Sequence, residues 1–158
     1  GISLSVNKLK GRIPLKAKSS YTPESSPVVR GRELTITATV NSKSADGVII
    51  AQGGSLVGYS LYLRDGRFIF GVRVNKKLEE LRSEPVVTGK AVKVEAHLGK
   101  DGRRTLVVDG VKVSADGPKL DPQPATGLST GEDQGPNVGN YKSEKFRGTI
   151  RDLVLEVR

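Results

Sequence analysis

The chain has 158 residues, with 26 Lys and Arg against 17 Asp and Glu, no Cys and a single His. This length fits one domain, which we expect to span residues 1–158. The missing Cys excludes disulfides, thiol nucleophiles and zinc–thiolate sites, and one His excludes a multi-histidine metal centre. No apolar run approaches the roughly 20 residues that cross a bilayer, so we expect no membrane insertion.

The start of the chain is its most basic part, because residues 1–32 carry seven Lys and Arg against one Glu. Ile2, Leu4 and Val6 alternate with polar residues, which predicts a short strand, and the Ser- and Pro-rich residues 19–29 predict a loop. We therefore expect a basic N-terminal strand and loop segment. The chain starts with glycine and contains no Met, so we also expect a processed or excised piece of a longer product.

From residue 33 onward the hydrophobic pattern has a period of two, which is typical of strands. Residues 33–40 and 91–98 both alternate apolar with polar side chains, so each is predicted to be a half-buried strand. The predicted core faces consist of Leu34, Ile36, Ala38 and Val40 in the first strand and Val92, Val94, Ala96 and Leu98 in the second.

Three Asp-Gly pairs predict three hairpins in series, because both residues of such a pair tolerate positive φ. The turns are Asp65-Gly66, Asp101-Gly102 and Asp109-Gly110. Around the first turn, residues 57–64 and 67–74 are predicted to point Tyr59, Leu61, Leu63, Phe68, Phe70, Val72 and Val74 inward.

The remaining segments are less regular. Residues 76–82 are too short and too poorly capped for a helix, so we expect a strand or irregular structure. Residues 116–141 hold five Gly and four Pro, which predicts a long surface excursion, and residues 146–157 are expected to form a closing strand with an imperfect alternation. About ten short strands without a convincing helix predict an all-β fold, an antiparallel two-sheet jelly-roll sandwich rather than a small closed barrel.

Several motifs resemble the concanavalin A-like, laminin G-like β-sandwich domains. They are DGVIIAQGG at residues 46–54, GYSLYLRDG at 58–66, VVDG at 107–110 and FRGTIRDL at 146–153. With the Gly- and Asp-rich residues 127–133, the pattern is similar to the C-terminal module of some bacterial arylsulfatases. The resemblance covers residues 32–157 and implies a sandwich that accompanies a catalytic domain. Each motif also has a purely architectural explanation.

The sequence offers no catalytic constellation, so we expect the chain not to be an enzyme. Glycan hydrolysis needs two carboxylates across a sugar, but Glu79 and Glu80 are adjacent and Glu95 stands alone on its strand. Sulfatase chemistry needs a modified Cys or Ser and a carboxylate-rich metal site, which the residues do not supply. A glucanase-type enzyme is the least favoured of our hypotheses.

A cationic sheet face is the most suggestive feature of the sequence. If the strand assignments hold, one face presents basic side chains beside an aromatic ring. Arginine can bind sulfate or carboxylate through two hydrogen bonds, and tyrosine can stack under a sugar. The favoured interpretation of His97 is a surface His on a polar strand face, and the alternative is a pair with Glu95 that would help it bind an anion. The candidate glycan-binding residues are Tyr62, Arg64, Arg67, Arg73, Lys93 and His97. The alternative is that these charges only keep a sheet face soluble.

Related sandwiches often hold Ca²⁺ on a rim loop, and the acidic residues 116–141 are the natural place for such a site. Asp133 is our first choice of ligand and Asp121 the second, with solvated loop charges as the alternative. No other cofactor is expected.

The leading hypothesis is a non-catalytic, lectin-like accessory module of a secreted or periplasmic carbohydrate-active enzyme of the sulfatase kind. Its expected partner is an anionic or sulfated polysaccharide. The alternative is a structural or protein-interaction domain that packs against a neighbouring catalytic domain. Specific nucleic-acid binding is not expected, because four Tyr and three Phe leave few stacking platforms.

Overall fold

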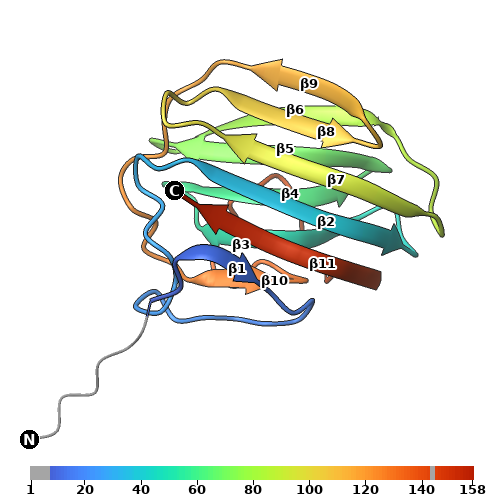
Figure 1. The fold of residues 1–158 in the computed structure, drawn as a ribbon, viewed down its shortest axis with the longest axis horizontal. Helices are drawn as coiled ribbons and strands as arrows, with labels where there is room; N and C mark the ends of the chain where they lie inside the picture. The colour runs from blue at the N-terminus through green and yellow to red at the C-terminus, as the bar shows by residue number, and fades with distance from the viewer. Residues whose placement is uncertain (1–7, 143–144) are drawn as a thin grey trace, which may run out of the picture.

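The computed structural model describes residues 8–142 and 145–158. This part of the chain has eleven strands and no helix (Figure 1). It therefore contains no helix that could cross a membrane. The strand predicted at residues 2–6 lies outside the described residues. The strands are β1 (Gly11–Pro14), β2 (Leu34–Ser42), β3 (Gly47–Gly53), β4 (Gly58–Arg64), β5 (Arg67–Val74), β6 (Lys77–Pro85), β7 (Ala91–Leu98), β8 (Arg104–Val108), β9 (Val111–Ala115), β10 (Leu128–Thr130) and β11 (Gly148–Val157).

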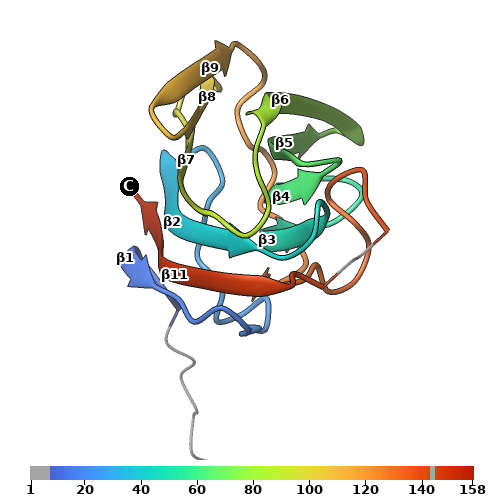
Figure 2. The same cartoon turned by 90° about the vertical axis from the view of Figure 1, so that its right-hand side faces the viewer.

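The strands form two sheets that pack face to face. Sheet A has six strands in the order β1-β11-β2-β7-β8-β9, and sheet B has five in the order β10-β3-β4-β5-β6. Figure 2 shows the two layers on either side of the core, and neighbouring strands in both are antiparallel. The predicted all-β antiparallel two-sheet jelly-roll sandwich is therefore confirmed.

The core faces follow the predicted alternation. Leu34, Ile36, Ala38 and Val40 of β2 are buried in one cluster with the inward residues of β4, β5 and β7. Two of the three predicted two-residue turns form, since Asp65 and Asp109 have φ values of 52° and 46°. The hairpin at Asp101-Gly102 also forms, but a longer loop of residues 99–103 joins β7 to β8, closed by a hydrogen bond from the amide of Gly99 to the carbonyl oxygen of Arg103. Residues 76–82 lie largely within strand β6, which follows an Asn75-Lys76 turn with φ values of 49° and 70°.

The uneven pattern of the closing strand has a structural cause. The register of β11 against β2 shifts between Arg151 and Val154, and Asp152 adopts a left-handed φ of 53°. Such a bulge adds one residue to a strand and reverses the side to which later side chains point. Ile150, Leu153 and Leu155 can therefore all be buried in the core.

The segment at residues 116–141 is more than the predicted surface excursion. Leu120, Leu128 and Val138 are buried, and the segment contains β10, which pairs with β3 at one edge of sheet B. Its start is tied down by Arg104, whose buried guanidinium donates to the carbonyl groups of Gly102 and Pro118. The Gly and Pro content correctly predicted the lack of long elements, but not this burial.

The described part of the basic N-terminal segment packs along the side of the sandwich that carries β1 and β10. The amide of Leu15 donates to the carbonyl oxygen of Leu153 at 2.9 Å, and the amide of Tyr21 donates to that of Leu128 at 2.9 Å. Further along, the side chain of Gln123 accepts from the amide of Val29 at 2.9 Å. These bonds fix the segment in place beside β10.

Candidate functional site

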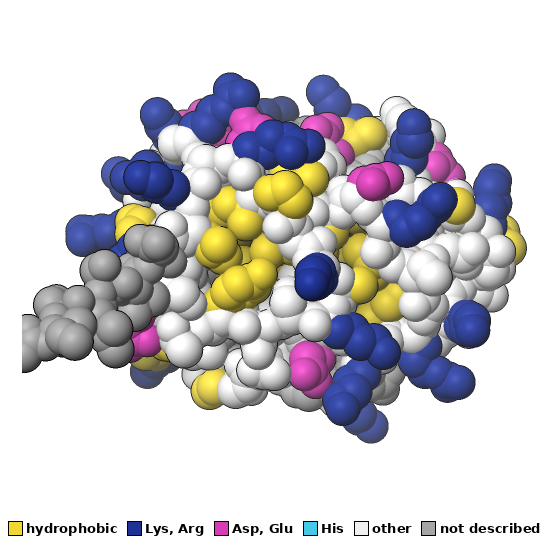
Figure 3. Space-filling model, turned by 60° about the horizontal axis from the view of Figure 1, so that its bottom comes forward, with side chains coloured by type: hydrophobic (Ala, Val, Ile, Leu, Met, Phe, Trp, Pro, Cys, Tyr) yellow, Lys and Arg dark blue, Asp and Glu magenta, His cyan; other side chains and the backbone are white. Residues whose placement is uncertain are grey.

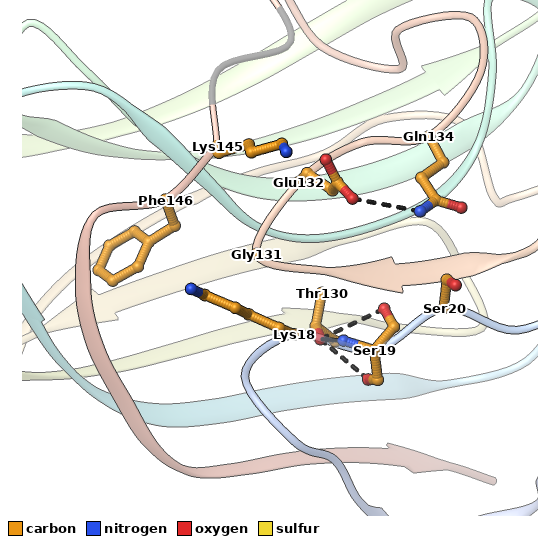
Figure 4. Close-up of a pocket in the computed structure, with 9 residues that line it drawn as sticks. All are labelled: Lys18, Ser19, Ser20, Thr130, Gly131, Glu132, Gln134, Lys145 and Phe146. Atoms are coloured by element: carbon orange, nitrogen blue, oxygen red, sulfur yellow. Dashed lines mark hydrogen bonds between the residues drawn. The ribbon is translucent and has the colours of Figure 1, made fainter.

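A hollow of about 250 Å³ lies where the N-terminal segment passes the end of β10. Figure 4 shows that its residues come from three separate parts of the chain: the N-terminal segment, the end of β10 with the following turn, and the approach to β11. The hollow is lined by Lys18, Ser19, Ser20, Thr130, Gly131, Glu132, Gln134, Lys145 and Phe146.

The N-terminal wall is held against β10 by hydrogen bonds of the Thr130 hydroxyl. The Thr130 hydroxyl donates to the carbonyl oxygen of Lys16 at 2.6 Å, and the amide of Ser19 donates to the Thr130 oxygen at 2.9 Å. Gly131 makes this approach possible, because it has a φ of 78° and a Cβ there would lie 2.6 Å from the carbonyl oxygen of Ala17. The exposed side chain of Lys18 is thereby placed at the hollow.

The opposite wall is formed where the chain enters β11. The amide of Phe146 donates to the carbonyl oxygen of Gly131 at 2.8 Å, and Lys145 forms a parallel bridge with Val48 of β3. Phe146 is buried among the core residues, while Lys145 stays exposed. Two lysines more than 120 positions apart in the sequence thus lie around one hollow (Figure 4).

The third side of the hollow is formed by residues 132–134, in which Glu132 and Gln134 point to the hollow and Asp133 points to the protein interior. The Asp133 carboxylate is buried and accepts hydrogen bonds from the amide of Val138, at 2.9 Å, and from the Tyr141 hydroxyl. Burial raises the pKa of Asp133, and these two hydrogen bonds offset the effect only in part. Glu132 and Gln134 on either side line the hollow instead, joined by a hydrogen bond of 3.2 Å between their side chains.

This arrangement combines positive charge with groups that both donate and accept hydrogen bonds. Neither Lys18 nor Lys145 has an ion-pair partner among the residues that the structure describes. The serine hydroxyls and the side chains of Glu132 and Gln134 can bind hydroxyl groups. Figure 3 shows Lys and Arg side chains spread around hydrophobic patches on the lower side of the molecule. The hollow is chemically suited to an anion that also carries hydroxyls.

Tyr62 is placed differently from the expectation that it stacks under a sugar. Its side chain is 0% exposed, and its hydroxyl donates to Glu80 at 2.6 Å. The ring meets that of Tyr141 edge to face, with centroids 4.7 Å apart. The stacking role is therefore wrong in this conformation, because residues 133–141 fold over the outer face of sheet B and bury the ring.

Arg64 and Arg73 fix that covering segment to the sheet. Arg64 donates to Glu80 at 2.8 Å and to the carbonyl oxygen of Asn140 at 2.9 Å, while Arg73 donates to that of Val138 at 2.6 Å. Burial raises the pKa of Glu80, but the hydrogen bonds from Tyr62 and Arg64 outweigh it, so the net pKa is lowered. Both guanidinium groups thus have internal partners.

The other candidate glycan-binding residues do not share one face. Arg67 of β5 belongs to sheet B and donates to the carbonyl oxygen of Ser83 at 3.0 Å. Lys93 and His97 lie on β7 of sheet A, on the other side of the sandwich. The expectation of one cationic face is wrong because the strands fall in two sheets, which alternation along each strand cannot reveal.

His97 has a partner that the sequence did not indicate. Nε2 of His97 lies 3.0 Å from a carboxylate oxygen of Glu33, at the residue before β2, rather than pairing with Glu95. The hydrogen bond with His97 lowers the pKa of Glu33. The register explains the choice, since β2 runs beside β7 with Thr35 opposite His97.

The two expected calcium ligands each have a protein partner. Asp133 accepts from Val138 and Tyr141, as described, and Asp121 pairs with Arg30 at 2.5 Å. Among the residues that the structure describes, no group of three His, Asp or Glu side chains could hold a metal ion. Calcium binding at Asp133 and Asp121 stays a prediction without support from this geometry.

Sequence reasoning missed Lys18 and Lys145. The signal for Lys18 was present as the basic bias of the first 32 residues, but nothing local to Lys145 marked it. Both line one hollow because two distant segments approach Gly131: the carbonyl oxygen of Ala17 lies where a Cβ would be, and the amide of Phe146 donates to the carbonyl oxygen of Gly131.

No protein-family model and no curated protein matches the chain. Mouse laminin alpha1 chain domains LG4-5 are similar in structure, with a TM-score of 0.75 and 21% identity over 96% of this chain and 42% of that chain. This chain therefore spans less than half of the laminin structure.

Two further structures extend the comparison. The CBM40 of the Ruminococcus gnavus IT-sialidase, bound to alpha2,6 sialyllactose, has a TM-score of 0.63 and 16% identity over 94% of this chain and 89% of that chain. A SAP-like pentraxin from Limulus polyphemus has a TM-score of 0.60 and 21% identity over 82% and 64%. Identities this low establish the fold alone. The chain has the concanavalin A-like, laminin G-like β-sandwich fold that its motifs predicted.

Proposed function

We propose that this chain is a non-catalytic carbohydrate-binding module that takes an acidic or sulfated glycan in the hollow between Lys18 and Lys145. The observation that carries the proposal is that two lysines, neither with an ion-pair partner within residues 8–142 and 145–158, line one hollow of about 250 Å³. The similarity to a carbohydrate-binding module supports it at the level of the fold.

The chemistry of the hollow suits such a ligand better than a simple anion. An ammonium group binds sulfate or carboxylate through charge-assisted hydrogen bonds, which are stronger than neutral ones. Ser19 and Ser20 add hydroxyl donors and acceptors, and Glu132 and Gln134 can accept from sugar hydroxyls. A glycan that carries both acidic groups and hydroxyls would use all of these residues at once.

The composition of the hollow also favours binding over hydrolysis. Glycoside hydrolysis requires two carboxyl groups about 5 to 10 Å apart across the scissile bond. Among the described residues that line the hollow, Glu132 carries the one carboxylate, and the carboxylate of neighbouring Asp133 accepts from Tyr141 instead. This part of the lining therefore offers one carboxyl group where hydrolysis uses two.

The resemblance to the module that follows the catalytic domain of some arylsulfatases extends the proposal to the parent protein. We infer that the module accompanies a secreted or periplasmic carbohydrate-active enzyme of the sulfatase kind and holds its acidic polymer near the catalytic domain.

A matched pair of polymers tests the proposal. Isothermal titration of the chain with dextran sulfate and with dextran, at low and high salt and with and without Ca²⁺, separates the sulfate contribution from the backbone sugar. We expect binding to dextran sulfate only, and about 5- to 10-fold weaker binding for Lys18→Gln and for Lys145→Gln. Polygalacturonate tests the carboxylate version of the ligand in the same way.

The control is Lys16→Gln, which removes the same charge from an exposed lysine of the same segment that does not line the hollow. We expect this variant to bind as tightly as the unmodified chain. Equal losses in all three variants would show a non-specific charge effect and would overturn the proposal.

A second candidate function, docking against a neighbouring domain, is favoured by a valine-rich hollow of about 280 Å³ between the edge strands β6 and β9. Val87 and Val111 line it with 72% and 61% of their surface exposed. A neighbouring catalytic domain would bury this apolar surface. Hydrogen exchange of residues 83–92 and 108–113, compared between this chain and its parent polypeptide, tests the idea. Equal exchange in both would exclude docking at this hollow.

A further inference from the structure

A further hollow, about 360 Å³ in volume, lies on the outer face of sheet A and shares no residue with the Lys18–Lys145 hollow. Figure 1 is seen from the side of this sheet, with β2 and β7 in its middle. We call this hollow the groove, and its floor and rim include Thr37, Thr39, Lys93, Glu95, Gly110 and Asp152.

The floor is set by the register of three neighbouring strands. Thr37 lies between Glu95 of β7 and Val154 of β11, and Thr39 lies between Lys93 and Arg151. Two residues along a strand span about 6.7 Å, so the two threonine side chains present hydroxyl groups at that spacing along β2. Charged side chains flank them on both neighbouring strands.

The two walls consist of irregular backbone. On one side the Asp109-Gly110 turn is fixed to β7, because the amide of Asp109 donates to the carbonyl oxygen of Lys93 at 2.9 Å. The amide of Lys93 donates in return to the Asp109 carboxylate at 3.1 Å. On the other side, the β11 bulge places Asp152 at the rim with a φ of 53°. The groove is thus bounded by a turn and a bulge that regular strands would not provide.

The charges of the groove differ from those of the chain as a whole. The chain has a net charge of +9, yet the charges at the groove balance, because Lys93 and Arg151 are matched by Glu95 and Asp152. None of these four side chains forms an ion pair within the described residues. Balanced charges give no net attraction for an anionic glycan.

Uncharged sugar hydroxyls complement this set, because each can donate to a carboxylate and accept from an ammonium or threonine hydroxyl. We propose that the groove over Thr37 and Thr39 is a binding site for an uncharged saccharide. This site is independent of the acidic-glycan site, since the two share no lining residue.

The test is a two-dimensional amide NMR titration of the whole chain with uncharged gluco-, manno-, galacto- and xylo-oligosaccharides. We expect one series to produce saturable shifts at Thr37, Thr39, Glu95 and Asp152, with no change at Lys18 or Lys145. The absence of saturable shifts with every series, or shifts confined to the Lys18–Lys145 hollow, would overturn the proposal.

Two variants locate the site. Thr37→Val combined with Thr39→Val removes both hydroxyls but keeps the branched shape, and Asp152→Asn removes a carboxylate while tolerating the left-handed backbone. Each should weaken binding by about 5-fold, since each removes hydrogen bonds to the ligand. The matched control is Thr35→Val, because Thr35 faces outward on the same strand but does not line the groove. Unchanged binding in the first two variants would contradict the assignment.

The two proposed sites can be tested separately. The threonine and Asp152 variants should leave dextran sulfate binding unchanged, and Lys18→Gln and Lys145→Gln should leave uncharged saccharide binding unchanged. A variant that abolishes both would show that the two hollows are not separate sites and would overturn the inference.

Discussion

The two outer faces of the sandwich are built from the same kind of alternating strand, but one is covered by a loop segment and the other is open. On sheet B, residues 133–141 cover Tyr62 and Ile69, which form a small buried cluster with Val48, Ala51 and Val138. On sheet A, no described segment covers the outward threonines of β2 and the charged side chains of β7 in this way. The difference shows that alternation assigns a residue to a face, whereas the cover on that face decides whether the residue is structural or free to bind.

Removing the ring beneath the cover should have the largest effect. Tyr62→Ala is expected to reduce the free energy of unfolding by about 3 to 5 kcal/mol, because it deletes a fully buried aromatic side chain. Urea denaturation measures the loss. Thr37→Ala on the open face is the comparison, and its loss should stay below about 1 kcal/mol. Similar losses in both variants would contradict the contrast between the faces.

Breaking the contacts of Arg64 should have the next largest effect. Arg64→Met keeps the aliphatic stem but removes the hydrogen bonds to Glu80 and Asn140, leaving a half-buried carboxylate with weaker partners. We expect a loss of about 1 to 3 kcal/mol. Combining it with Glu80→Gln should recover part of the loss, because the uncompensated charge is then absent. A double variant no more stable than Arg64→Met would argue against this ion pair as the cause.

The covered face should also give a distinctive pH dependence. Burial raises the pKa of Asp133 above its ordinary value of 3.8, so the folded protein holds this proton more tightly than the unfolded chain. The stabilisation that protonated Asp133 contributes is therefore complete below the pKa of the unfolded chain. It is lost as the pH rises through the raised pKa of Asp133 in the folded protein.

Urea denaturation of the unmodified chain and of Asp133→Asn, from about pH 3 to about pH 7, isolates this contribution. The stability of the unmodified chain should fall relative to the variant as pH rises across that window. Glu80, whose pKa is lowered, should behave in the opposite sense in a matched comparison with Glu80→Gln. If the free energy of unfolding changed with pH in the same sense for Asp133 and Glu80, the opposite pKa shifts assigned to them would be contradicted.

Charges on the open face should have the smallest effect on stability. Lys93→Gln and His97→Gln should each change the free energy of unfolding by no more than about 0.5 kcal/mol, because both side chains project from the uncovered face. Thermal unfolding followed by circular dichroism is sufficient to check this. The His97–Glu33 hydrogen bond joins two half-exposed side chains and should contribute little, so a loss above about 1 kcal/mol would contradict the view of this face as open.

Much of the fold could be predicted from local pattern. Period-two alternation located β2 and β7 with their core faces, and the Asp-Gly pairs located the tight turns, because both signals depend only on residues near one another in sequence. The pairing of strands into sheets depends on distant segments. For that reason Lys93 and His97 could be assigned to the polar side of a strand but not to the sheet opposite Arg64.

The candidate site could be predicted much less well. Tyr62 and Arg64 had the side chains expected of a glycan site, but the cover formed by a distant segment made them structural. Lys18 and Lys145 come to line one hollow through the positive φ of Gly131 and a hydrogen bond from the Phe146 amide to its carbonyl oxygen, which are properties of tertiary packing. A basic N-terminal segment was visible in the sequence, whereas its docking beside β10 was not.

The most direct test of the account is an amide NMR titration of the chain with a sulfated hexasaccharide. The proposed function predicts saturable shifts at Lys18, Ser19, Thr130, Glu132 and Lys145, retained at moderate salt and absent in Lys18→Gln combined with Lys145→Gln. Shifts spread evenly over exposed lysines and lost on adding salt would contradict a built glycan site and leave only a cationic surface.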